Sequence, residues 1–159
     1  MKILVAFYSK SDNTKSMAQA LKDAFESNSH EVKFLELIPK NSGNSKELLK
    51  LGKFEFEEEI FDVSEFDLIV IGTPVANFSV HFVVEKYVRL LENTENKKVG
   101  LFCSSVALAG STIKSLDSLL STMQADVIGS LTIKSLFELD KKKIDKVKKF
   151  ALELMKKSL

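Results

Sequence analysis

The sequence predicts an α/β domain in which a five-stranded parallel sheet carries helices on both faces. Five short apolar runs alternate along the chain with five segments whose apolar residues recur at helical spacing. The runs are almost continuously apolar, as expected for strands that are buried on both faces. The 159 residues contain no internal repeat and no linker rich in Pro or Gly, so we expect one domain over 1–159.

Each element is predicted from its own pattern. The run ILVAF at 3–7 is the first strand, and LIVI at 68–71, followed by Gly72, is the most apolar one. In the first helix, Met17, Leu21 and Phe25 recur on one face. The predicted strands are 3–7, 32–38, 68–71, 99–103 and 127–133, and the predicted helices are 13–28, 46–54, 79–91, 113–123 and 144–155.

Composition narrows the class of protein. Hydrophobic residues make up 45% and charged residues 28% of the chain, which is typical of a folded, soluble protein. No apolar run approaches the roughly 20 residues of a membrane helix, and the first run is too short for a secretory signal. A single cysteine fits a reducing cytoplasm, and with only two histidines a zinc site is not expected. We therefore expect a cytoplasmic protein that binds no membrane.

Charge is nearly balanced overall but uneven along the chain. The formal net charge of +1 gives no general attraction to nucleic acid, and we expect none to bind. Residues 54–67 carry seven acids and no base, whereas residues 137–159 carry eight lysines against four acids. Both segments can be solvated surfaces, or they can be docking patches of opposite sign.

Polar side chains follow the first strand and lead directly into a helix. Ser9, Ser11, Asn13 and Thr14 surround this helix start, where unpaired backbone N–H groups and the helix dipole favour an anion. In a parallel sheet, ligands bind beyond the carboxyl ends of the strands. The alternative is that Ser11, Asp12 or Asn13 only caps the helix.

The stretch 5–21, VAFYSKSDNTKSMAQAL, resembles the amino-terminal signature of the flavodoxins. In that family, a Ser/Thr-x-Ser/Thr-Gly-Asn-Thr loop after the first strand holds the phosphate of FMN, and Ser9, Ser11, Asn13 and Thr14 match it. The order of the elements is similar along essentially the whole chain, and the length resembles the short-chain members. The resemblance implies a sheet order 2-1-3-4-5, non-covalent FMN and electron transfer.

One residue of this loop departs from the family pattern. Asp12 occupies the position of the glycine, and its carboxylate would repel a phosphate or cap the helix itself. Lys10 and Lys15 can offset this charge. The residues assigned to the phosphate are Ser9, Lys10, Ser11, Asp12, Asn13 and Thr14.

Two further loops resemble the loops that hold the flavin ring in the family. After the third strand, Ala76 stands in place of a stacking Trp, and Phe78 either stacks on the ring or serves as a core or helix-start residue. His81 is expected at the surface. The residues assigned to the ring are Pro74, Val75, Ala76, Asn77 and Phe78 from this loop, and Ser104, Ser105 and Val106 from the loop after the fourth strand. Cys103 is expected to be a buried strand residue without a catalytic role.

The resemblance implies an FMN-binding electron-transfer protein that meets a redox partner protein as a monomer or weak dimer. Any redox chemistry would belong to the flavin, with the chain supplying orientation and electrostatics. Two alternatives stay open. One is a flavodoxin-like NAD(P)H-dependent quinone or flavin oxidoreductase, for which Ala76 leaves space above the ring. The other is a flavin-free binding module, which Asp12 and Ala76 favour.

Overall fold

A computed structural model describes residues 1–40, 47, 50 and 54–159. Within these residues the chain forms six strands and four helices. The strands are β1 (Lys2–Phe7), β2 (Glu31–Glu36), β3 (Leu68–Ala76), β4 (Ser79–Val80), β5 (Lys98–Ser105) and β6 (Asp126–Lys134). The helices are α1 (Asp12–Ser27), α3 (Phe82–Arg89), α4 (Thr112–Thr122) and α5 (Lys141–Ser158). The predicted helix at 46–54 lies outside the described residues, apart from 47, 50 and 54.

The predicted α/β fold is confirmed. Five strands pair in parallel in the order β2-β1-β3-β5-β6, which is the 2-1-3-4-5 order once the parallel strands are counted alone. The short β4 pairs antiparallel with the end of β3. The switch in strand order lies between β1 and β3, so their carboxyl ends mark the place where a ligand is expected.

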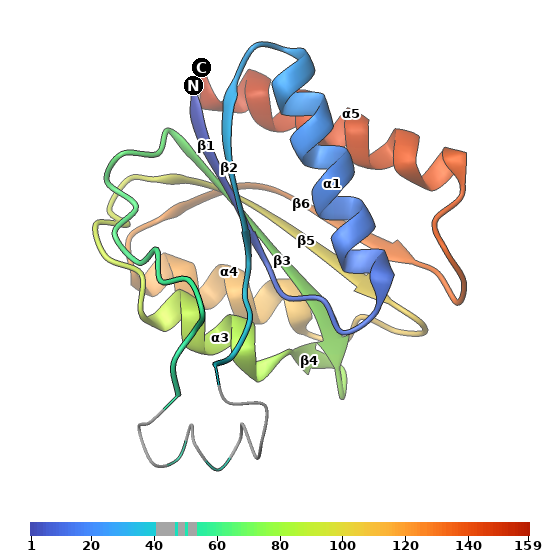
Figure 1. Cartoon of the computed structure of the whole chain (residues 1–159), viewed down its shortest axis with the longest axis horizontal. Helices are drawn as coiled ribbons and strands as arrows, with labels where there is room; N and C mark the ends of the chain where they lie inside the picture. The colour runs from blue at the N-terminus through green and yellow to red at the C-terminus, as the bar shows by residue number, and fades with distance from the viewer. Residues whose placement is uncertain (41–46, 48–49, 51–53) are drawn as a thin grey trace.

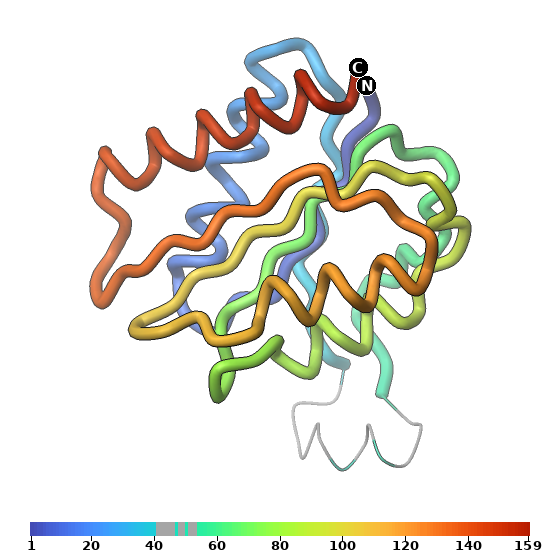
Figure 2. Tube along the Cα trace, turned by 180° about the vertical axis from the view of Figure 1, so that it is seen from behind, coloured from blue at the N-terminus to red at the C-terminus, as the bar shows by residue number. Residues whose placement is uncertain are grey.

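The sheet separates two layers of helices, as Figures 1 and 2 show from opposite sides. Helices α1 and α5 cover one face, and α3 and α4 cover the other. Ile3, Val5 and Phe7 of β1 pack in the cluster below α1 and α5, whereas Leu4 and Ala6 pack in the cluster on the other face. Because neighbouring side chains of a strand point to opposite faces, this one apolar run contributes to both cores.

The third strand extends further than predicted. The prediction ended it at Ile71, because Gly72 and Pro74 are unusual inside a strand, but β3 continues to Ala76. From there the chain turns back into β4, so α3 begins at Phe82 rather than at 79. The extension carries the chain beyond the sheet and places a hairpin over its carboxyl edge.

The acidic segment 54–67 is not simply a solvated loop. Its acids are on the surface, but Phe54, Phe56 and Phe66 are buried in the core on the α3 and α4 side. Phe56 also forms an isolated antiparallel bridge with Pro39. The phenylalanines of this segment therefore anchor it in the core, while the acidic side chains between them face solvent.

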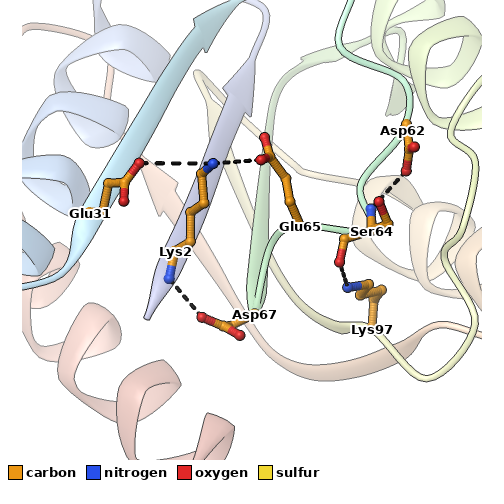
Figure 3. A network of polar contacts seen from close by, with 7 residues as sticks. All are labelled: Lys2, Glu31, Asp62, Ser64, Glu65, Asp67 and Lys97. Atoms are coloured by element: carbon orange, nitrogen blue, oxygen red, sulfur yellow. Dashed lines mark hydrogen bonds and ion pairs between the residues drawn. The ribbon is translucent and has the colours of Figure 1, made fainter.

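Polar contacts tie together the amino ends of the strands (Figure 3). The Lys2 ammonium lies 2.6 Å from Glu65 and 3.9 Å from Glu31, and the Lys2 backbone N–H donates to Asp67 at 2.7 Å. The network stands at the edge of the sheet opposite to the loops described next. No helix in the described part of the chain is both long and apolar enough to cross a membrane.

Candidate functional site

The amino end of α1 presents backbone N–H groups at the carboxyl end of β1. Ser11 precedes the helix in an extended conformation, with φ −130° and ψ 162°, and its side chain makes no capping hydrogen bond. Asp12 is the first helical residue and is exposed, so it does not cap the helix. The first-turn N–H groups of an α-helix have no partner within the helix, and these groups are therefore available to an anion.

The polar side chains of the loop after β1 fix its conformation. The Ser9 hydroxyl donates to the Ser11 carbonyl oxygen. Asn13 Nδ2 donates to the Phe137 carbonyl oxygen at 3.1 Å, which ties α1 to the loop before α5. The Thr14 hydroxyl is buried and lies 2.6 Å from the Ser104 hydroxyl, which ties α1 to β5. Two of the predicted phosphate residues, Asn13 and Thr14, thus tie α1 to neighbouring elements through their side chains, and Ser9 fixes its own loop.

Residues 77 and 78 form the turn between β3 and β4. Val75 pairs with Val80 and Ala76 with Ser79, which leaves a two-residue loop. Asn77 and Phe78 both have positive φ, 49° and 62°, as a type I′ hairpin turn requires. Phe78 is 61% exposed, so the interpretation of Phe78 as a core residue is wrong. A bulky residue in this conformation is uncommon, and the aromatic ring is presented to solvent at the carboxyl edge.

The hairpin tip packs on the loop after β5. The Ser111 N–H donates to the Phe78 carbonyl oxygen at 3.0 Å. Gly110 has a φ of 57°, and a methyl group on it would come within 2.6 Å of Phe78 Cβ. Glycine is therefore required at position 110 both by the backbone conformation and by the close approach of the two loops.

A groove of about 350 Å³ lies where these loops meet. Its walls come from the loop after β1, the end of β3, and the ends of β5 and β6. The lining residues are Lys10, Ser11, Asn13, Pro74, Val75, Ser104, Ser105, Val106 and Ser135. Eight of these nine were predicted as site residues; Ser9, Asp12 and Thr14 do not line the groove.

Two further hollows share residues with this groove. One, of about 480 Å³, shares Lys10, Pro74 and Val75 with it and also includes the predicted Ala76 and Asn77. The other, of about 630 Å³, shares Val106 and Ser135 and lies against residues 134–143. Ligand sites of about 300–1,000 Å³ are typical of cofactors, so the combined depression is large enough for a mononucleotide.

Several exposed apolar side chains lie in the loops at this edge of the sheet. Eight large hydrophobic side chains of the described residues are exposed, and five of them lie in the three loops after β3, β5 and β6. These five are 61–77% exposed: Phe78, Val106, Leu108, Leu136 and Phe137. Of these five, Val106, Leu136 and Phe137 line the hollows and can contact a bound molecule there.

His81 is not at the surface, contrary to the prediction. It is 8% exposed and caps α3, because its Nδ1 accepts the Val83 N–H at 3.3 Å. Its ring stacks on Tyr8, with the ring centroids 4.3 Å apart. Tyr8 immediately follows β1, so this pair joins the first loop to the start of α3.

Of the two lysines that were expected to offset the charge of Asp12, only Lys10 lines the groove. Lys15 bonds to Glu36 of β2 at 2.8 Å, and this hydrogen bond raises the pKa of Lys15. Lys15 is thus already engaged, and Lys10 is the lysine of this loop that lines the groove. Within the described residues, no group of three or more His, Cys, Asp or Glu could hold a metal ion.

Cys103 is buried in β5, as predicted. Its Sγ lies 3.2 Å from the Thr132 hydroxyl, and burial raises the pKa of the thiol. A raised pKa favours the protonated thiol over the reactive thiolate.

The loop between β6 and α5 was not predicted as part of the site. Ser135 is buried and lines the groove, and its N–H donates to the Ser105 carbonyl oxygen at 2.9 Å. Leu136 and Phe137 follow it as exposed apolar residues. Two large apolar residues between a strand and a helix cap could have indicated this loop in the sequence. Their position beside Asn13 could not be known, because it depends on the order of the strands in the sheet.

Comparisons with known proteins show the fold. No family model matches the chain, and a search of curated proteins finds no match. Solved structures do match: a flavodoxin from the domain Archaea has 20% identity and a TM-score of 0.71, with 99% of both chains covered. Flavodoxin 1 and Flavodoxin 2 from Bacillus cereus have 17% and 24% identity, with TM-scores of 0.74 and 0.70. Each alignment covers 98–99% of both chains.

The chain therefore has the flavodoxin fold. The same fold occurs as part of larger proteins, since the chain also matches 36% of a rubredoxin oxygen:oxidoreductase from Desulfovibrio gigas at a TM-score of 0.74. These identities are below 25%, so the likeness extends to the architecture and not to an activity.

Proposed function

We propose that this protein binds FMN non-covalently at the carboxyl edge of its sheet and serves as an electron-transfer protein. The observation that supports this most is the amino end of α1, whose Ser11 makes no side-chain capping hydrogen bond, beside a groove that the exposed Val106 lines. A flavin mononucleotide requires a helix start that binds its phosphate and an adjoining slot that holds its planar, largely apolar ring.

The residues fit the group in two separate regions. The phosphate would meet the N–H groups of Asp12, Asn13 and Thr14, with Ser11 and Lys10 at the mouth of the groove. The ring would lie between the β3–β4 hairpin and residues 104–106, where small side chains permit close approach to the backbone. When bound, FMN supplies one- and two-electron redox chemistry, and the chain holds and orients it.

Thr14 has a different part in this proposal than the family pattern implies. Its hydroxyl is bonded to Ser104 inside the protein, so we assign to Thr14 a backbone contact with the phosphate rather than a hydroxyl contact. Phe78, which replaces the missing aromatic at position 76, stands exposed at the hairpin tip and is free of core packing.

Titration with FMN and riboflavin tests the proposal, because the two ligands share the ring and differ in the phosphate. We expect FMN to bind at least about tenfold more tightly than riboflavin, since a charge-assisted contact with several N–H groups contributes more than 1.4 kcal/mol. Val106→Asn should weaken both ligands, whereas Leu152→Asn, at an exposed apolar residue of α5, should weaken neither. Equal affinity for FMN and riboflavin, or no binding of either, would refute the proposal.

The oxidoreductase alternative predicts a different result from the same preparation. Oxidation of NADH or NADPH by the FMN-loaded protein, without a separate reductase, would make it an enzyme rather than a carrier. The flavin-free alternative predicts that the purified protein is colourless and takes up no added FMN. In the structure Asp12 does not occupy the anion position itself, because it is the first residue of α1 and not its cap, and this favours the flavin-binding proposal.

A further inference from the structure

We infer that the loop at 134–143 forms a docking surface for an acidic redox partner protein. That the partner is a redox protein rests on the proposed function. The surface itself is inferred from separate observations. Leu136 and Phe137 are 67% and 77% exposed at its centre. Lys134 and Lys143 line the hollow beside them, and Lys141 and Lys142 begin the adjoining helix α5.

The lysines of this surface have few partners in the protein. Lys143 donates to the Ser135 hydroxyl at 3.0 Å and lies 4.0 Å from Asp140. In the described part of the chain, Lys134, Lys141 and Lys142 make no ion pair. By contrast, Lys2 and Lys98 at the opposite edge of the sheet lie 2.6 and 2.5 Å from carboxylates. Among the described residues, Lys148, Lys149 and Lys156 further along α5 also make no ion pair, but Lys134, Lys141 and Lys142 are the ones that lie at or beside the hollow next to the groove.

These lysines are also unfavourable where they stand. Lys141, Lys142 and Lys143 occupy the first turn of α5, which contains no acid, although the capping Asp140 carboxylate accepts the Lys143 N–H at 2.9 Å. Cations at the amino end of a helix oppose the helix dipole. A local arrangement that opposes helix stability is expected where it serves a surface function.

The pattern of charge and apolar area favours a protein as the occupant. An exposed apolar centre within a charged rim is the usual anatomy of a protein interface. Glu138 and Asp140 lie between the lysines, and they would repel the uniform negative charge of a nucleic acid or an anionic bilayer. An acidic protein surface can place its own groups to match this mixed pattern.

A second copy of this chain is a weaker candidate for the partner. Its acidic segment, 54–67, already pairs several of its carboxylates within the protein. Glu55 lies 3.4 Å from Lys40, Glu58 lies 2.5 Å from Lys33, and Glu65 is bound to Lys2. Because these charges are neutralised locally, the segment offers less to a basic surface than an acidic partner would.

The surface adjoins the proposed flavin site and shares Val106 and Ser135 with it. Asn13 donates to the Phe137 carbonyl oxygen, and Val106 and Ser135 line both the groove and the hollow at 134–143. A partner seated on Phe137 would therefore lie against the rim of the groove, where electron transfer over a short distance is possible.

The test uses two forms of one haem protein with opposite charge. Cytochrome c is basic, and succinylated cytochrome c is the same protein with its lysine amines converted to carboxylates. Binding of each form to the flavin-free protein is measured by calorimetry at low and high salt, together with anionic vesicles and duplex DNA. We expect the succinylated form alone to bind, and its affinity to fall steeply as salt screens the charges.

A matched pair of variants locates the surface. The triple variant Lys134→Gln, Lys141→Gln, Lys142→Gln should bind succinylated cytochrome c at least about tenfold more weakly. The control Lys148→Gln, Lys149→Gln, Lys156→Gln removes the same charge from exposed positions further along α5, and it should change affinity by less than about twofold. Circular dichroism checks that both variants are folded.

Equal losses in the two triple variants would overturn the inference, because the effect would then come from net charge alone. Tighter binding of native cytochrome c, of vesicles or of DNA would overturn it as well. The FMN affinity of the triple variant at Lys134, Lys141 and Lys142 is measured separately. If the protein fails to bind FMN yet binds succinylated cytochrome c at the predicted lysines, the proposed function fails and the docking surface stands.

Discussion

Gly110→Ala tests the contact between the two loops that flank the proposed ring slot. The substitution adds a methyl group to a residue with φ 57°, directed at the backbone of Phe78 with Phe78 Cβ 2.6 Å away. A left-handed conformation costs a non-glycine residue about 1–2 kcal/mol, and a forced contact costs about 1–3 kcal/mol. The reduced freedom of the unfolded chain offsets about 0.4–1 kcal/mol of this.

The net expectation is a loss of about 2–4 kcal/mol in the free energy of unfolding. For a chain of this size, this corresponds to a melting temperature roughly 5–15 °C lower. Urea denaturation measures it directly, and the midpoint should fall while the slope m stays the same. FMN affinity should fall with stability, because the hairpin must move away from the loop after β5.

Gly129→Ala is the matched control for this prediction. Gly129 lies in β6 with an ordinary φ, and an added methyl group would stand 3.3 Å from the flexible ends of Leu154 and Phe150. We expect its effect to stay within about 1 kcal/mol. A loss of less than about 0.5 kcal/mol for Gly110→Ala would refute the reasoning, because the two loops could then not be in contact at this point.

Three further predictions concern single contacts. Thr14→Val and Ser104→Ala should each lower the free energy of unfolding by about 1–3 kcal/mol, because each leaves a buried hydroxyl without its partner. The double variant should lose less than the sum of the two single losses. Additive losses in urea denaturation would be inconsistent with a hydrogen bond between the two hydroxyls. Tyr87→Phe removes a 2.8 Å hydrogen bond to the Ile60 carbonyl and should cost about 1 kcal/mol at pH 7. Burial raises the pKa of Tyr87 above its ordinary value of 10.0, so this phenol stabilises the fold below pH 10 and that contribution is lost as the pH rises further. The wild type should therefore lose stability more steeply above pH 10 than Tyr87→Phe. Parallel curves of stability against pH would count against this. Asp12→Asn should tighten FMN roughly 3–10-fold at low salt, by removing repulsion of the phosphate, and should leave riboflavin unchanged; an equal gain for both ligands would exclude this cause.

The central strands and the long helices could be predicted from the sequence because their patterns are local. The apolar runs of β1 and β5 need no knowledge of their neighbours, since any strand buried on both faces has this composition. The bounds of α1 were predicted to within a residue at each end, because Ser11 and Asn28 flank a regular helical repeat.

The hairpin after β3 could not be predicted because its turn lacks the usual sequence. A type I′ turn normally carries Asn-Gly, and here Asn77 is followed by Phe78. Without that signal, the proline at 74 favoured an end to the strand. His81 was misplaced for a related reason: its burial comes from capping α3 and stacking on Tyr8, and neither contact is visible before the hairpin is known.

The candidate site was predicted in part. The loops after β1, β3 and β5 were found because a parallel sheet gathers its carboxyl ends at one edge. The roles of individual side chains were not, since the Thr14 hydroxyl faces Ser104 and the Asn13 amide faces Phe137. Those partners are 90 and 124 residues away in sequence, and only the packing of α1 against β5 and the last loop brings them together.

Amide chemical-shift mapping with FMN tests the central claim most directly. In nitrogen-15 spectra of the protein, saturating FMN should move the amide resonances of residues 11–14 and 104–106. Inorganic phosphate alone should move only the first group, because it lacks the ring. Shifts confined to another part of the molecule, or an unchanged spectrum at millimolar FMN, would contradict the claim that the carboxyl edge of this sheet holds a flavin mononucleotide.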